Sequence, residues 1–429
     1  VLNGKTQEVE ILTLEDCLRI GIDNNLSLEG KRKEIQKSKY GVSENRSKLL
    51  PQINAIAGYN NNFDPPVSVT DGSSYGVPYN ITKTLQHSAN AGLEMQMPLF
   101  NQTLYTSMSI AKVMEEISRL SYGKAREDVI LQISKMYYLG QVTAEQIMLI
   151  KANIIRLEEL RDITQAFFDN GMSMEVDLKR VNINLENLKV QYDNAQAMMK
   201  QQLNMLKYIM DYPAEKEIAL TPVNTDSITT VALTGLSENI YELQLSQSQV
   251  QLAERQKKII TNGYIPSLSL TGSWRYAAYT DKGYHWFHSG PSNQWFRSYG
   301  VGLTLRIPIF DGLDKTYKIK KAMIDIENKR LAWEDARKNL QTQYLNAVND
   351  LMNNQRNFKK QKDNYLLAED VYAVTSDRYR EGIASMTEVL QDEMQMSEAQ
   401  NNYISAHYNY RVTNLMLLKL TGQIESLVK

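Results

Sequence analysis

The chain has 429 residues and a formal net charge of -1, from 48 lysines and arginines against 49 aspartates and glutamates. This balance gives no whole-chain sign of a protein that binds nucleic acid or an anionic membrane surface. The single cysteine, Cys17, excludes an intramolecular disulfide, a cysteine-rich zinc site and a redox pair, and we interpret it as a small packing residue. No segment reaches the ~20 apolar residues of a transmembrane helix, and the N-terminus has neither the basic nor the apolar region of a signal peptide.

The first predicted element is a helix that runs from Thr13 to Pro51, roughly 38 residues or about 57 Å at 1.5 Å per residue. Thr13 and Asp16 have the spacing of a capping box, and Pro51 ends the helix because proline lacks an amide proton. Two alternating strands are expected next, at about 52–63 and 88–98, with a loop at about 64–86. Asn101 then caps a helix of roughly 70 residues that leads to a glycine turn at Gly171 and a further helix, about 173–210.

The second half of the sequence repeats this order. Three landmarks recur: Leu-Pro at 50–51 and Ile-Pro at 265–266, Pro-Leu-Phe-Asn at 98–101 and Pro-Ile-Phe-Asp at 308–311, and the glycine turns at Gly171 and Gly382. They predict strands at about 267–279 and 299–308 and helices at about 312–381 and 385–420. We therefore divide the chain into a first repeat (1–210), a linker (211–236), a second repeat (237–420) and a C-terminal tail (421–429). Each repeat is expected to form a rod about 100 Å tall.

The helix after each glycine turn has a coiled-coil pattern. Apolar residues are spaced alternately by three and four after Gly171, and the matched positions after Gly382 include one acid, Asp392. The two series are Leu178, Val181, Leu185, Leu188, Tyr192, Ala195 and Met199, and Val389, Asp392, Met396, Ala399, Tyr403, Ala406 and Tyr410. Small and aromatic occupants favour shallow packing in a helical barrel wall, and a generic antiparallel coiled coil is the alternative.

The predicted strands alternate apolar and polar residues, as membrane β-strands do. Four strands cannot close a barrel, and open edges are not tolerated in lipid, so three copies giving twelve strands are expected if the strands lie in a membrane. Trp286, Phe287, Trp295 and Phe296 fit an aromatic girdle near the strand ends, with a solvent-covered hydrophobic cluster as the alternative. A soluble hairpin tip on a coiled coil is the alternative for the whole strand set.

In the order in which these features occur, the sequence resembles the TolC family of outer-membrane efflux and secretion channels over essentially its whole length. The resemblance rests on Asn24-x-x-x-Leu28 and Asn239-x-x-x-Leu243, the Leu-Pro and Pro-Ile-Phe-Asp-Gly elements, and the two glycine turns. It implies a homotrimer in the outer membrane of a Gram-negative bacterium, with a 12-stranded β-barrel continuous with a periplasmic α-helical barrel. The linker and the tail would belong to an equatorial region.

The resemblance also implies partners and a closed end. A periplasmic membrane-fusion adaptor, working with an inner-membrane pump, would dock on the two glycine turns, at Gly171, Met172, Ser173, Gly382, Ile383 and Ala384. Asp177 would accept a hydrogen bond from Tyr379 of a neighbouring coiled coil and so hold the tip shut. The family's second locking residue is an arginine, and its place is taken here by Ala384.

Asp392 stands on a packing seam where the first half has Val181, so we expect it to face water, because a dry carboxylate is costly. Threefold symmetry would turn Asp392, or Glu388, into a lumenal ring of acids that attracts cations. The family's inner acid falls one residue earlier, at Gln391. An ordinary solvated carboxylate is the alternative.

The sequence contains no phosphate-binding glycine loop, no GxSxG, HExxH or CxxC, so we expect neither an enzyme nor a cofactor. His285 and His288 lack further metal ligands, and the 18 methionines leave metal efflux as a minor alternative. We therefore predict a passive duct for small molecules such as drugs and toxic compounds. Type I protein secretion, or a soluble periplasmic adaptor or scaffold, are the alternatives.

Overall fold

The computed structural model describes residues 9–71, 73–222, 235–281 and 295–428. Its contacts divide the chain into two compact units, and each draws on both halves of the sequence. The helical unit comprises Val1–Ile35, Ser118–Gln247 and Leu331–Lys429. The sheet unit comprises Gln36–Ile117 and Ser248–Arg330.

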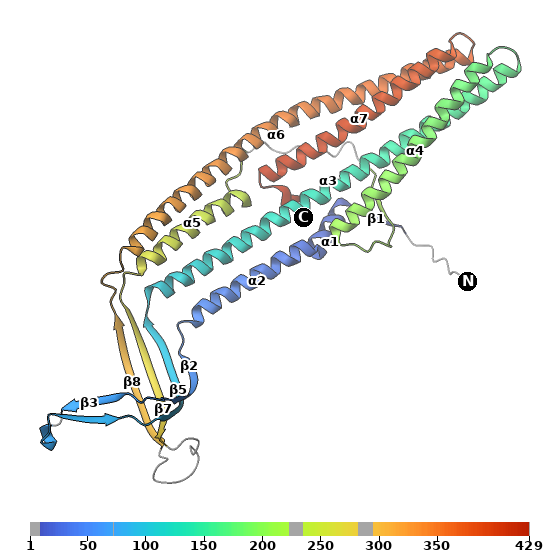
Figure 1. The fold of residues 1–429 in the computed structure, drawn as a ribbon. Coiled ribbons are helices and arrows are strands. Elements are labelled where there is room, and N and C mark those ends of the chain that lie inside the picture. Colours follow the sequence, from blue (N-terminus) through green and yellow to red (C-terminus); the bar gives the residue numbers. More distant parts are fainter. Residues whose placement is uncertain (1–8, 72, 223–234, 282–294, 429) are drawn as a thin grey trace, which may run out of the picture. The chain divides into compact units, whose positions relative to one another are not determined.

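The sheet unit contains the four predicted strands (Figure 1). They are β2 (Gln52–Asn61), β5 (His87–Phe100), β7 (Ser267–Thr280) and β8 (Trp295–Arg306). They pair antiparallel in the order β2-β5-β7-β8, so the two central strands come from different halves of the sequence. The strand prediction is confirmed for all four, and β8 starts four residues earlier than expected.

The register of the sheet confirms the predicted alternation. Leu93 of β5 lies opposite Trp274 of β7, which in turn lies opposite Tyr299 of β8. The neighbouring row carries Glu94 and Ser273. Because side chains alternate along a strand, one face is apolar and the other polar. We call these the apolar face and the polar face of the sheet.

Two expectations for the strand ends need correction. The expected loop at 64–86 contains a hairpin of β3 (Val67–Asp71) and β4 (Tyr79–Lys83), because short alternating runs flank a turn with a left-handed Gly76. Trp295 and Phe296 are successive residues of β8, so they lie on opposite faces and cannot both belong to a girdle on one face. Trp286, Phe287, His285 and His288 lie outside the described residues.

The described helices follow the predicted order of long and short segments. They are α1 (Leu14–Asn24), α2 (Leu26–Ser47), α3 (Gln102–Asp169), α4 (Glu175–Met210), α5 (Tyr241–Asn262), α6 (Asp314–Arg380) and α7 (Met386–Leu420). The capping box of Thr13 and Asp16 is present, and Asn101 accepts amide hydrogen bonds from the first turn of α3. The helix of the second half begins later than expected, because Gly312 and Leu313 both have left-handed backbone conformations.

The first predicted helix is wrong in one respect, since it consists of two helices separated at Asn25. The Asn25 side chain accepts a hydrogen bond from the backbone N–H of Leu28 and donates one of 2.8 Å to the carbonyl of Ile209 at the end of α4. Asn25 therefore caps α2 and also ties the break to a distant helix.

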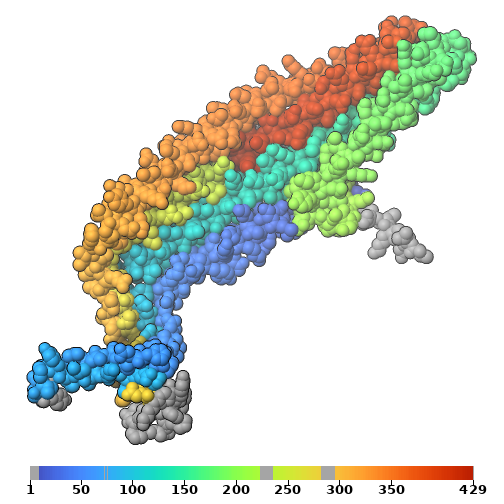
Figure 2. All heavy atoms as spheres, in the orientation of Figure 1, coloured from blue at the N-terminus to red at the C-terminus, as the bar shows by residue number. Residues whose placement is uncertain are grey.

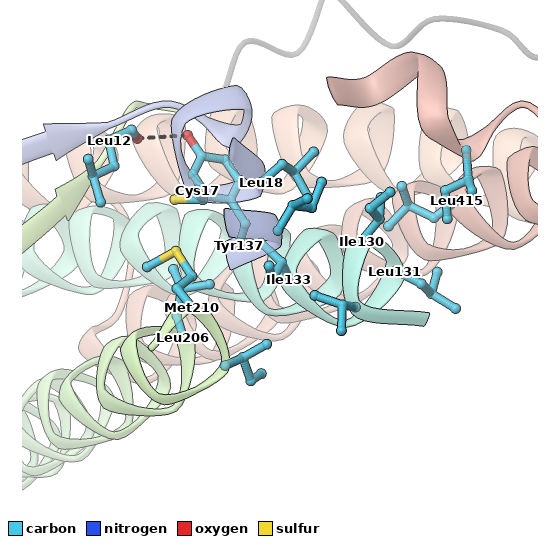
Figure 3. Packing of buried hydrophobic residues seen from close by; sticks show 14 of the residues in the cluster. Leu12, Cys17, Leu18, Ile130, Leu131, Ile133, Tyr137, Leu206, Met210 and Leu415 are labelled. Carbon is cyan, nitrogen blue, oxygen red and sulfur yellow. Dashed lines mark hydrogen bonds between the residues drawn. The ribbon is translucent and has the colours of Figure 1, made fainter. Parts of the chain in front are cut away.

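The core of the helical unit next to α1 is built from buried residues of β1 (Glu10–Leu12), α1, α2, α3, α4, β6 (Ile218–Leu220), α7 and the short 3-10 helix η2 (Ile424–Val428), and Figure 3 shows part of it. Strand β1 pairs in parallel with β6, and the Tyr137 hydroxyl donates a hydrogen bond of 3.2 Å to the Leu12 carbonyl. Cys17 is fully buried among these residues, which confirms its interpretation as a packing residue. Helix η2 closes the C-terminal side through Ile424.

Candidate functional site

The two glycine turns lie side by side at one end of the helical unit (Figures 1 and 2), where Arg180 after the first turn donates a hydrogen bond to Thr387 after the second. Gly171 follows α3 with a φ of 72°, and Gly382 follows α6 with a φ of 74°. In each turn the glycine N–H donates to the carbonyl three residues back, and the next N–H donates to the carbonyl five residues back. This is the Schellman ending of a helix, which requires a left-handed residue and therefore favours glycine.

Both turns present an apolar side chain to solvent directly after the glycine. Met172 is 68% exposed and Ile383 is 62% exposed, whereas Ser173 and Ala384 are half-buried. Met174 is also exposed. Exposed apolar side chains therefore follow both glycine turns. The structure thus brings the six predicted docking residues together.

The helices after the two turns begin differently. Ser385 accepts a hydrogen bond from the backbone N–H of Glu388, and the Glu388 carboxylate accepts one of 2.7 Å from the Ser385 N–H. These hydrogen bonds lower the pKa of Glu388. Met174 stands at the matched position of α4 and provides no side-chain cap. Glu388 therefore has a capping role that Asp177, its counterpart, lacks.

Asp177 takes part in a link between α4 and α7. Its carboxylate pairs with Arg180 at 3.2 Å, and Arg180 also donates to the Thr387 hydroxyl at 3.4 Å. The Asp177 side chain is only 15% exposed, whereas that of Arg180 is 50% exposed. An ion pair with one well-solvated partner contributes on the order of 1 kcal/mol, so this link is weak enough for Asp177 to change partners.

Tyr379 lies inside the bundle, where its hydroxyl bonds to Thr164 and not to Asp177. The tyrosine is only 6% exposed, and the centroid of its ring lies 5.6 Å from that of the Phe167 ring. Its hydroxyl donates a hydrogen bond of 3.3 Å to the Thr164 hydroxyl. In this chain the Tyr379 hydroxyl is therefore bonded inside the bundle, and its predicted hydrogen bond to Asp177 across neighbouring coiled coils stays a prediction.

The acids of α7 are distributed differently from the expectation. Asp392 is half-buried, whereas the next residue, Glu393, is 5% exposed and has a pKa raised by burial. Helix α7 packs against both α3 and α6, so it buries a wider stripe than one coiled-coil seam. The spacing of Glu393, Gln400 and His407 by seven was the signal in the sequence that could have shown this second seam.

A buried polar cluster along this second seam was missed by the sequence analysis. Tyr403 donates to Glu145 at 3.0 Å, and the fully buried His407 lies 3.4 Å from the same carboxylate. Arg411 donates to His407 Nε2 at 3.0 Å, which leaves the ring proton on Nδ1, facing Glu145. The cluster fixes the register of α7 against α3.

None of the described helices has the length and apolar character to cross a membrane. The described residues also hold no group of three or more His, Cys, Asp or Glu side chains placed to bind a metal ion.

The family model described as outer membrane efflux protein matches residues 20–210 and 232–423, which is most of the chain. The chain therefore belongs to the outer membrane efflux protein family. It is similar to the outer membrane protein TolC of Vibrio cholerae, with 21% identity over 399 residues, 89% of this chain and 84% of that protein. It is also similar to the toluene efflux pump outer membrane protein TtgC of Pseudomonas putida, with 23% identity over 379 residues, 83% of this chain and 75% of that protein.

Solved outer-membrane channels have the same fold. OprN superposes with a TM-score of 0.77 at 14% identity, over 95% of this chain and 89% of that one. The open state of MtrE from Neisseria gonorrhoeae gives a TM-score of 0.75 at 19% identity, over 95% of this chain and 88% of that one. The resemblance stated from the sequence is thus confirmed, as is placement in the outer membrane.

Proposed function

We propose that three copies of this chain form the outer-membrane exit duct of a tripartite efflux system, which passively conducts small molecules delivered by a periplasmic adaptor and an inner-membrane pump. The observation that carries the proposal is the four-stranded sheet, with an apolar face and with β2 and β8 at its two edges. Edges that remain unpaired in lipid are costly, and three copies pair every edge in a twelve-stranded barrel. The efflux names of the relatives support small molecules as the cargo.

The division into two repeats is part of the same proposal. Each half supplies two strands to one sheet and a long helix followed by a glycine turn. The two stretches matched by the family model, 20–210 and 232–423, support repeats at 1–210 and 237–420 with a linker at 211–236 and a tail at 421–429. Most of the chain would then lie in the periplasm, as the helical barrel.

The glycine turns form the adaptor-docking surface in this proposal. Supporting it are the two adjacent Schellman turns and the exposed apolar residues that follow them, Met172 and Ile383. A rigid turn that presents an apolar side chain loses little conformational freedom when a partner covers it.

The closed state would rest on Asp177. Its side chain is only 15% exposed and pairs with the half-exposed Arg180, so a new donor would have to displace Arg180 to bond to it. To donate to Asp177 the Tyr379 hydroxyl must leave Thr164, so closing the tip would couple to packing inside the bundle. Asp392 is the better candidate for the lumenal acidic ring, because Glu388 is already engaged in its capping box.

Single-channel recordings in planar bilayers test these assignments. Asp177→Ala removes the proposed acceptor and is expected to raise the open probability, whereas Asp392→Ala removes the ring and is expected to lower the preference for cations. Glu186→Ala, at an exposed position of α4 away from the turns, serves as the control and should match the wild type.

The outcomes separate the parts of the proposal. Absence of conductance from wild-type protein that inserts into the bilayer would overturn the duct itself. Conductance with unchanged open probability in Asp177→Ala and unchanged selectivity in Asp392→Ala would leave the duct and overturn the assignments at the tip.

A further inference from the structure

An ion pair lies on the polar face of the sheet, between the two central strands. Arg275 of β7 pairs with Glu94 of β5, and the two strands belong to different halves of the sequence. In the register, Glu94 stands opposite Ser273 and Arg275 stands opposite Gly92, so the two side chains are diagonal neighbours on one face. Diagonal neighbours are within reach of long side chains.

Gly92 makes room for this arrangement. A Cβ at this position would lie 2.4 Å from the carbonyl oxygen of Trp274 and 2.8 Å from the Cα of Arg275. No side chain larger than hydrogen therefore fits at this crossing of the two strands. The bare backbone of β5 leaves the space over which the Arg275 side chain reaches Glu94.

The pair borders an open recess and is not packed into a core. The recess has a volume of about 430 Å³ and includes Glu94 itself together with polar or side-chain-free positions of all four strands, namely Asn54, Gln96, Thr271, Ser273, Gly300 and Gly302. The side chains of Arg275 and Glu94 remain 40% and 45% exposed. An ion pair this open contributes at most about 1 kcal/mol to stability. Its main physical consequence is therefore the cancellation of two charges on the polar face.

Glu94 has no substitute in this role. Across β2, β5, β7 and β8 it is the one acid, whereas these strands carry three arginines, Arg275, Arg297 and Arg306. Arg306 stands opposite Ser267 and shares the polar face, whereas Arg297 stands opposite Tyr276 and belongs to the apolar face. Without Glu94 the polar face would be purely basic.

We propose that Glu94 and Arg275 are selectivity residues of the duct, and that Glu94 cancels the guanidinium charge which would otherwise hold back cationic solutes in the strand section. This rests on the proposed function, in which the polar face lines the lumen. In a trimer, loss of Glu94 leaves a ring of three unpaired arginines that favours anions, and loss of Arg275 leaves a ring of three carboxylates that favours cations.

The experiment measures reversal potentials in planar bilayers under a KCl gradient for Glu94→Gln, Arg275→Gln and the double variant. We expect the cation-to-anion permeability ratio to fall about twofold or more in Glu94→Gln, to rise by a similar factor in Arg275→Gln, and to return to the wild-type value in the double variant. Both shifts should shrink in 1 M salt, where the Debye length is only about 3 Å. Arg297→Gln, on the apolar face, is the matched control and should leave the ratio unchanged.

Two results would overturn the inference while leaving the duct intact. One is a reversal potential equal to wild type in both single variants that conduct, and the other is an equal shift in Arg297→Gln. If one single variant fails to assemble, the remaining single variant and the double variant still decide, because the single variant must shift the permeability ratio and the double variant must restore the wild-type value. If inserted wild-type protein carries no current, the proposed function fails and this inference fails with it.

Discussion

Gly382 ends α6 with a left-handed backbone, and no neighbouring atom lies within 4 Å of the position that a Cβ would occupy. Gly382→Ala therefore tests the backbone alone. We expect the substitution to lower the free energy of unfolding by about 1 kcal/mol, because an L-residue is strained in this conformation. Thermal unfolding in detergent and faster amide exchange in the last turn of α6 are the measurements.

Gly41 supplies the matched control for that substitution. It lies inside α2 with a helical backbone and also has nothing within 4 Å of a Cβ. Gly41→Ala is expected to stabilise the protein by about 0.5–1 kcal/mol, since alanine is the better helix former. Equal effects of the two substitutions would contradict the account of the turn.

At the residue scale, the sequence predicts what depends on local backbone geometry. The positions of both glycine turns and the capping role of Asn101 follow from patterns of a few residues. The orientation of Tyr379 does not, because its hydroxyl bonds to Thr164, which is 215 residues away in the sequence. Long-range hydrogen bonds of buried groups depend on packing that a single sequence does not reveal.

At the scale of packed elements, Glu127 of α3 is an acid whose pKa is shifted by the packing of helices. It is 4% exposed where α3 meets the end of α7, and burial raises its pKa to about 7, partly offset by Lys419. A folded-state pKa above the ordinary value of 4.5 means that the folded protein holds the proton more tightly than the unfolded chain does. This contribution to stability is complete below pH 4.5 and is lost as the pH rises through about 7.

Glu127→Gln imitates the protonated acid and should remove that loss. We expect its melting temperature to match that of the wild type near pH 4.5 and to be higher at pH 8. At pH 8 its free energy of unfolding should exceed the wild-type value by on the order of 1–3 kcal/mol. The check is thermal unfolding of both proteins across this pH range, with Glu116→Gln at an exposed position of the same helix as control. A constant difference between wild type and Glu127→Gln at every pH would contradict the assignment.

At the element scale, periodicity predicts the long helices and the four strands, because their patterns extend over many residues. It misses the break at Asn25, which is fixed by a hydrogen bond to Ile209, 184 residues away. It also misses the hairpin of β3 and β4, whose alternating runs have only five residues each. Short elements give weak periodic signals, and tertiary contacts decide them.

At the scale of the whole molecule, the two faces of β8 are expected to have different surroundings. Val301 belongs to the apolar face, is 79% exposed, and stands near the middle of the strand. Thr304 belongs to the polar face of the same strand and is also exposed. In the proposed trimer the first contacts lipid and the second lines the lumen.

Arginine at each position distinguishes the two environments. A lipid-facing arginine near the bilayer midplane costs about 2–4 kcal/mol, and the trimer would contain three of them. We therefore expect Val301→Arg to be depleted from the outer-membrane fraction and from the detergent-resistant trimer, and Thr304→Arg to reach both. Because both substitutions place the same charge on one strand, three residues apart, a general intolerance of β8 to arginine predicts equal losses. Equal losses, or a loss confined to Thr304→Arg, would mean that the apolar face of the sheet does not contact lipid.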